Sequence, residues 1–204
     1  GDKIILEYYM DILGNESAKV LDLAYLNSLY HTGVKNHLDS AVLRCREMPG
    51  HELHFQELAA QYQKLDELPF DYERRFASVL VRRGEENLLI LKGSIDEVYG
   101  RCSSVEYKDA RHEISGDGME SVRAVVDEML EDGMKVLAVA YKPLKGEALL
   151  PQDEHDLILL GYLAFFDAPK DSAAGAIEKL HKLHVGVRVL TGDHRDIAVS
   201  VCRR

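Results

Sequence analysis

A lysine that directly follows a run of aliphatic residues is the first side chain in this sequence that suggests chemistry. The stretch LLILKGS (residues 88–94) has the pattern of a buried strand ending at Lys92, Gly93 and Ser94. A cation at a strand end can contact an anionic ligand, and a glycine beside it leaves room for that ligand. The alternative is that Lys92 only caps the strand and faces solvent.

A second candidate lies upstream, in the stretch LPFDYERRFASVLV (residues 68–81). It places an aromatic residue, Phe70, and two arginines, Arg74 and Arg75, just ahead of a predicted strand. An adenine ring needs a flat apolar surface on which to stack, and its phosphates need cations nearby. Phe70, Arg75 and Lys92 together have the types for both tasks. Taken one at a time, Phe70 is better explained as a core residue, and the two arginines as the solvated edge of a hairpin.

Two short motifs near the C-terminus also contain residue types that can carry chemistry. TGD (Thr191, Gly192 and Asp193) follows the apolar run VGVRVL, which predicts a parallel strand. At the end of such a strand, a hydroxyl, a close-approach glycine and a carboxylate lie in the ligand crevice. Asp193 is also typical of a helix N-cap. The motif DAPK starts at Asp167, and its Pro169 predicts a stiff joint or the start of a helix.

Composition and short motifs exclude several classes of function. A net charge of −10 argues against sequence-independent nucleic-acid binding. The longest apolar run, residues 157–166, is about half the length of a membrane-spanning helix. No GxxxxGK[ST] motif occurs, so a phosphate-cradling loop of that type is not expected. The pairs His51/His54 and His181/His184 lack a nearby third ligand, so no metal site is predicted.

The elements that must position these residues follow from hydrophobic periodicity. The pattern predicts strands over residues 2–12, 75–83, 87–93, 134–144 and 156–166, and a hairpin over 105–114. It predicts helices over residues 18–31, 36–45, 51–65, 94–102 and 120–133. After Pro169 a helix, a short apolar strand, a turn and a second helix follow, and this order is typical of a doubly wound parallel sheet.

Six motifs taken in chain order carry more information than any one of them: NHLDSAVL, PFDYERRFASV, LLILKGSIDEV, GMKVLAVA, FFDAPK and VLTGD. This ordered set resembles the nucleotide-binding domain of P-type ATPases running into the first part of their phosphorylation domain. Its details are most similar to the bacterial magnesium-transporting branch, and the resemblance covers essentially the whole chain. It implies an α+β fold with an antiparallel sheet flanked by helices over residues 1–166. Residues 167–204 are then the hinge and a partial, Rossmann-like α/β phosphorylation domain.

By position, the resemblance implies a set of ATP-binding residues: Asp39, Phe70, Arg75, Lys92, Gly93 and Lys135. Phe70 is expected to stack on adenine, and Asp39 to accept a hydrogen bond from the adenine amino group. Arg75 is expected near the nucleotide, and Lys92 and Gly93 are expected to line the depth of the pocket. Lys135 stands where the family often has an arginine and is expected to meet the phosphates.

The resemblance also implies catalytic roles for Thr191, Gly192 and Asp193 in the phosphorylation site, and a hinge containing Asp167 and Pro169. The DKTGT motif, whose aspartate is phosphorylated in the family, and the magnesium-holding GDGxND motif do not occur in the sequence. GDGMES (residues 116–121) shares three letters with the latter but is predicted to be a turn before a helix. We therefore expect this chain alone to hydrolyse ATP very slowly.

The resemblance thus implies the ATP-binding cytoplasmic domain of an inner-membrane pump that couples ATP hydrolysis to cation transport, with Mg²⁺ as the expected cation. ATP with Mg²⁺ is the expected ligand, and the remaining phosphorylation, actuator and transmembrane domains of the same polypeptide are the expected partners. One alternative is a non-catalytic regulatory or interaction module, because Ser94 and Ala168 depart from the family's alanine and proline. The other is a freestanding phosphatase of the haloacid-dehalogenase type, but Asp2–Lys3 opens the chain instead of ending a strand.

Overall fold

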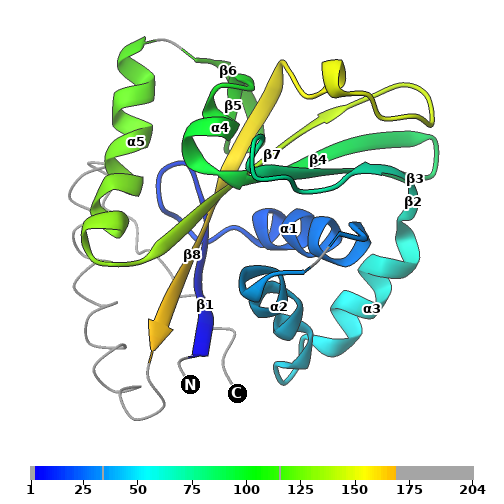
Figure 1. Ribbon diagram of the computed structural model, residues 1–204, viewed down its shortest axis with the longest axis horizontal. Coiled ribbons are helices and arrows are strands. Elements are labelled where there is room, and N and C mark those ends of the chain that lie inside the picture. The colour runs from blue at the N-terminus through cyan, green and yellow to red at the C-terminus, as the bar shows by residue number, and fades with distance from the viewer. Residues whose placement is uncertain (1–2, 34, 115, 169–204) are drawn as a thin grey trace.

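The computed structural model describes residues 3–33, 35–114 and 116–168, where helices cover both faces of one sheet (Figure 1). The elements follow in the order β1 (Lys3–Asp11), α1 (Ala18–Tyr30), α2 (His37–Leu43), η1 (Arg44–Glu47), α3 (Glu52–Gln61), β2 (Gln63–Leu68), β3 (Phe76–Arg83), β4 (Glu86–Ser94), α4 (Ile95–Tyr99), β5 (Cys102–Tyr107), β6 (Ala110–Glu113), α5 (Gly116–Glu131), β7 (Lys135–Pro143), η2 (Pro151–Asp153) and β8 (Leu157–Ala168). The α+β class expected from the sequence is confirmed.

The described strands are joined in the order β2-β3-β4-β7-β8-β5-β6, and β1 pairs with β8. Strand β8 borders β7 on one edge. On its other edge it pairs first with β5, at Leu157–Leu159, and then with β1, from Gly161 to Ala168. Every pair is antiparallel except β5 with β8, which is parallel. The sheet is therefore largely antiparallel, as expected, with one parallel pair, because the chain crosses over through β6, α5 and β7 between β5 and β8.

Strands β3, β4 and β7 are buried on both faces, which explains their nearly continuous apolar sequences. In β4, Leu89 and Leu91 pack with α4 and α5, while Leu88 and Ile90 pack with α1, α2 and α3. This period-two alternation assigns each later residue of the strand to one face. Lys92 therefore belongs to the face covered by α1–α3.

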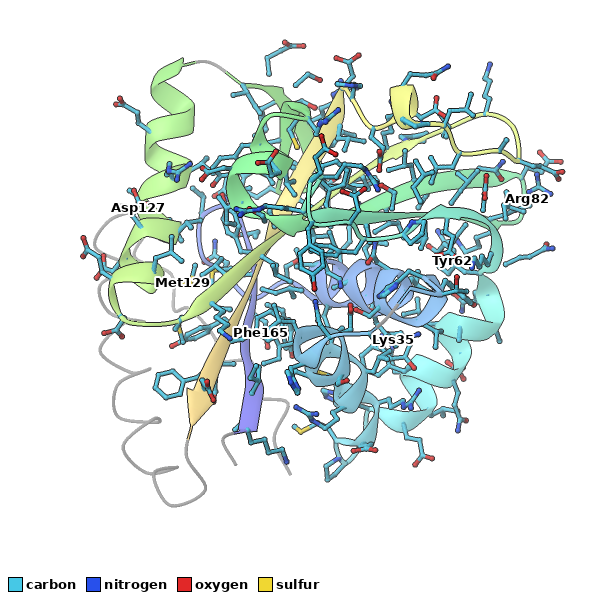
Figure 2. All side chains as sticks on the ribbon, in the orientation of Figure 1. Lys35, Tyr62, Arg82, Asp127, Met129 and Phe165 are labelled. Carbon is cyan, nitrogen blue, oxygen red and sulfur yellow. The ribbon has the colours of Figure 1, made fainter. Side chains whose placement is uncertain are left out.

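The interior consists of two apolar layers, one on each side of the sheet. The side chain of Phe165 on β8 is fully buried in the layer beneath α1–α3, whereas Asp127 on α5 is exposed (Figure 2). The apolar run at residues 157–166 forms most of β8, and none of the described helices has the length and hydropathy to cross a membrane.

Two sequence predictions about elements are wrong. The helix expected over residues 51–65 ends at Gln61, and residues Gln63–Leu68 form strand β2. This segment is polar, but pairing with β3 satisfies its backbone along one edge, so the tertiary partner overrides local preference. The expected turn at residues 116–121 is the start of α5. Once the apolar side of α5 packs on the sheet, the helix can extend over residues 116–121 without a second nucleation step.

Candidate functional site

Lys92 lies in the interior and not at a solvated strand end. Its side chain points from β4 toward α1 and α2, and the residue is 6% exposed. The Lys92 Nζ atom lies 2.7 Å from Asp39 Oδ1. A buried ammonium needs such a partner, because moving an unpaired charge out of water is unfavourable by several kcal/mol. Removing one partner of a buried ion pair destabilises a protein by about 3–5 kcal/mol. The alternative of a simple solvated cap is therefore wrong.

Asp39 is the centre of a buried hydrogen-bond cluster. It is held near the start of α2 by a capping box with Asn36. Its Oδ1 accepts from Ser28 Oγ at 2.8 Å as well as from Lys92, and its Oδ2 lies 3.0 Å from His31 Nε2. Burial raises the pKa of the Asp39 carboxyl, but the His31 hydrogen bond and the Lys92 charge outweigh burial and hold this pKa well below its usual range. Asp39 Oδ2 also accepts from the Asn36 N–H at 3.4 Å. Each oxygen thus already accepts two hydrogen bonds, so a ligand donor must share or displace one of them.

The loop between β2 and β3, residues 69–75, brings two aromatic rings and a cation together. The rings of Phe70 and Tyr72 meet edge to face, with centroids 5.7 Å apart. Phe70 is 41% exposed and Tyr72 is 91% exposed. Arg75, at the end of the loop, has the left-handed φ of 63°, and its N–H donates to the Asp71 carbonyl at 2.8 Å. The loop thus offers an accessible aromatic surface beside an exposed guanidinium.

Gly93 has a structural reason that the sequence did not reveal. A Cβ atom at this position would lie 2.4 Å from the Arg75 carbonyl oxygen and 2.4 Å from Phe76 Cβ. The Ser94 N–H donates to the same Arg75 carbonyl at 3.0 Å. The first atoms that a Gly93 side chain would meet therefore belong to Arg75, at the end of the loop, and to Phe76, the first residue of β3.

These segments surround a cavity of about 250 Å³. It is lined by His31, Asn36, Leu38, Asp39, Phe70, Tyr72, Arg75, Ala77, Lys92, Gly93, Ser94 and Leu137. Five of the six residues predicted to bind ATP are among them. The sixth, Lys135, is exposed at the first position of β7, two residues before Leu137, and does not line the cavity.

Sequence reasoning missed several residues of this cavity. Tyr72 lies within the PFDYERR motif, so its position beside Phe70 was an available signal. Leu137 follows Lys135 by two residues, and strand alternation places the two on one face. His31 follows the last residue of α1 and carries no sequence signal, because its role depends on Asp39 being folded against it.

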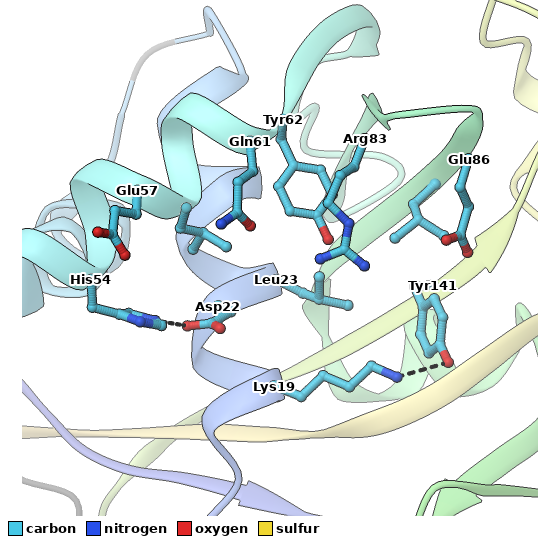
Figure 3. Close-up of a pocket in the computed structure, with 12 residues that line it drawn as sticks. Lys19, Asp22, Leu23, His54, Glu57, Gln61, Tyr62, Arg83, Glu86 and Tyr141 are labelled. Atoms are coloured by element: carbon cyan, nitrogen blue, oxygen red, sulfur yellow. Dashed lines mark hydrogen bonds and ion pairs between the residues drawn. The ribbon is translucent and has the colours of Figure 1, made fainter.

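A second cavity of about 430 Å³ lies at the other end of α1 (Figure 3). Its polar groups mostly bind one another. His54 Nε2 lies 2.8 Å from Asp22 Oδ1, and Lys19 Nζ donates to Tyr141 at 3.1 Å. The guanidinium of Arg83, also on its wall, lies over a tyrosine ring. Because most of these polar groups already have partners, we take the smaller cavity, with its accessible Phe70 ring, as the better candidate for binding a ligand.

The remaining predicted residues lie at or beyond the end of the described chain. Asp167 is exposed near the end of β8 and pairs in register with Ile4 of β1. Pro169 and the TGD residues Thr191, Gly192 and Asp193 lie outside the described residues. Within the described part of the chain, no group of three or more His, Cys, Asp or Glu side chains is arranged to hold a metal ion.

Comparison with known proteins adds an independent line of information. Residues 31–172 match the family described as "P-type ATPase, cytoplasmic domain N". Over 98% of its length the chain is 40% identical to "Magnesium-transporting ATPase, P-type 1" of Escherichia coli K12 and 39% identical to the protein of that name in Salmonella typhimurium LT2. Over 73% of its length it is 29% identical to "Calcium-transporting ATPase 1" of Lactococcus lactis. The chain spans 22%, 22% and 17% of these three relatives.

Proposed function

Because the chain belongs to the family of P-type ATPase cytoplasmic N domains, we propose that the cavity between α2, the 69–75 loop and strand β4 binds the adenine nucleotide of ATP. One observation carries the proposal. Asp39, Phe70 and Lys92 come from three separate segments spread over 53 positions, yet they line a single cavity and have the types that a nucleotide needs. An accessible aromatic ring suits the base, and cations near the mouth suit the phosphates.

In this proposal the base enters beside Phe70, which supplies the stacking surface. The buried Lys92–Asp39 pair forms the floor and is neutral as a unit, so it suits a base better than a triphosphate. The exposed Arg75 is then free to meet the phosphates, with Lys135 further out along the same face of the sheet. Since each Asp39 oxygen already accepts two hydrogen bonds, binding the adenine amino group requires Asp39 to share or exchange one of them.

Mg²⁺ is expected to arrive with the nucleotide. Among the described residues that line the cavity, Asp39 has the one carboxylate, and it already binds Lys92, Ser28 and His31, so the metal belongs with the phosphates. The chain's own contribution is to bind and orient ATP, so that the γ-phosphate meets an acceptor elsewhere.

For the whole protein we propose a pump of the inner membrane that transports Mg²⁺, with this chain on the cytoplasmic side. The names of the E. coli and Salmonella relatives support this choice of cation. In this proposal the phosphoryl acceptor is an aspartate outside the 204 residues, and the TGD motif (residues 191–193) belongs to the adjoining phosphorylation domain. The hinge at Asp167 and Pro169 links the two domains, and the actuator and transmembrane domains complete the pump.

Titration of the 204-residue chain with ATP, followed by ¹H–¹⁵N chemical shifts, tests the proposed site. We expect saturable shifts around the cavity, and Phe70→Ala should weaken binding by about tenfold, because base stacking on one ring contributes about 1–3 kcal/mol. Arg83→Ala is a matched control, since this arginine is exposed beside the second cavity. No binding at millimolar ATP, or equal binding by the Phe70→Ala variant, would favour a non-catalytic module that has kept the fold.

A further inference from the structure

The loop that carries Phe70, Tyr72 and Arg75 is held by a residue that does not line the cavity. Arg74 lies between these residues in sequence, but its guanidinium bonds to protein atoms. Its Nη1 donates to the Pro69 carbonyl at 2.8 Å and to Asp71 Oδ2 at 2.9 Å. The Arg74 backbone N–H donates to Asp71 Oδ1 at 2.6 Å. One side chain therefore ties the start of the loop to its end.

The second anchor of Arg74 comes from a distant part of the chain. Its Nη2 donates to Glu154 Oε2 at 2.6 Å, across 80 positions of sequence. Glu154 lies in the connection between β7 and β8 and is 2% exposed. The same Oε2 atom accepts a hydrogen bond from the Ser78 hydroxyl on β3. The Arg74 guanidinium also covers the Phe76 ring, 4.8 Å from its centroid.

A buried carboxylate bound to an arginine holds that arginine in place, because Glu154 without Arg74 would be a buried, unpaired charge. The Arg75 backbone, next to Arg74, has the left-handed φ of 63°, which an arginine adopts only when its surroundings require it. A loop that is already ordered loses less conformational entropy when a ligand binds. The contacts of Arg74 thus set how well the loop is prepared for a ligand.

We propose that Glu154 and Arg74 are positioning residues, which hold the 69–75 loop in the conformation that presents Phe70 and Arg75 to the nucleotide. Neither side chain touches the ligand. Through Glu154, the β7–β8 connection thereby affects nucleotide affinity without contacting the nucleotide. This inference rests on the nucleotide-binding function proposed above.

The test compares three variants of the 204-residue chain. Glu154→Leu removes both hydrogen bonds, and Glu154→Gln keeps a hydrogen-bond acceptor without the charge. Glu147→Gln is the matched control. Glu147 lies on the same connection and pairs with Arg82 at 2.9 Å, but its side chain is 69% exposed. Each variant is examined for ATP affinity, for urea stability, and for ¹⁵N backbone order parameters of residues 70–75 without nucleotide.

We expect the dissociation constant for ATP to rise about three- to tenfold in Glu154→Leu, less in Glu154→Gln, and not at all in Glu147→Gln. Without nucleotide, order parameters of the 70–75 loop should fall from about 0.85 toward about 0.6 in Glu154→Leu. Unchanged loop order in a folded Glu154→Leu protein overturns the inference, as does an unchanged ATP affinity. If the wild type binds no ATP, the proposed function fails instead, while the loop-order measurement still decides whether Glu154 holds the loop.

Discussion

Substitution of Lys92 by methionine gives a direct measure of how the floor of the cavity is built. Methionine keeps most of the apolar stem but removes the charge. The Lys92 and Asp39 side chains are only 5% and 8% exposed, and their charged atoms are 2.7 Å apart. Loss of one partner of a buried ion pair costs about 3–5 kcal/mol, because the other charge stays buried. Asp39 retains hydrogen bonds from Ser28 and His31, so we expect a loss near the lower value, about 3 kcal/mol.

The control is Lys64→Met. Lys64 and Glu67 are also 2.7 Å apart, but their side chains are 28% and 14% exposed. This pair is nearer the surface than Lys92–Asp39, and surface pairs contribute about 0–1 kcal/mol, so this variant should lose about 1 kcal/mol or less. The two substitutions thus share residue type and distance, and differ in burial.

The assay is urea denaturation followed by circular dichroism, which yields the free energy of unfolding for each variant. The double variant Lys92→Met/Asp39→Asn should regain much of the loss, since it removes both charges from the interior and keeps an amide oxygen that can accept from Ser28 or His31. Equal losses in the Lys92 and Lys64 variants, or no recovery in the double variant, would refute the view that burial makes the Lys92–Asp39 pair costly to break.

Two further predictions concern Gly93 and Asp39. Gly93→Ala should lower the free energy of unfolding by about 1–3 kcal/mol, measured by urea denaturation, because its Cβ would lie 2.4 Å from the Arg75 carbonyl. Gly100→Ala is the control and should change stability by less than about 1 kcal/mol, since its φ is −63° and its Cβ has ordinary contacts. The pKa of Asp39 is lower in the folded chain than the value of about 3.9 expected when unfolded. Its ionised form therefore adds stability above about pH 4, and that stability is lost as pH falls toward the folded pKa. The difference in unfolding free energy between wild type and Asp39→Asn should be largest near pH 7 and shrink below about pH 4, and a difference that stays constant down to pH 3 would contradict this assignment.

Local patterns were enough to predict most elements of this chain. The apolar runs around Val79 and Ile90 predicted two strands, and these are β3 and β4, which pair with each other. The spacing of valines near Val125 predicted a helix, and α5 contains it. Strand β2 was missed because its six residues, Gln63–Leu68, carry no alternating apolar pattern, and only the hydrogen bonds to β3 make them a strand. Short-range periodicity is visible in sequence, whereas edge pairing is not.

In the candidate site, too, the sequence predicted which residues take part, but not how they contact one another. The order of the motifs in the sequence suggested which residues belong together, and five of the six predicted ATP-binding residues line one cavity. Only the tertiary structure decided how they interact. Lys92 is neutralised by Asp39, 53 positions away, and the loop carrying Phe70 is anchored by Glu154. Gly93 is required by the backbone of the neighbouring strand. Residue types and their order along the chain determine which chemistry is available, but hydrogen bonds and burial between distant segments exist only once the chain has folded.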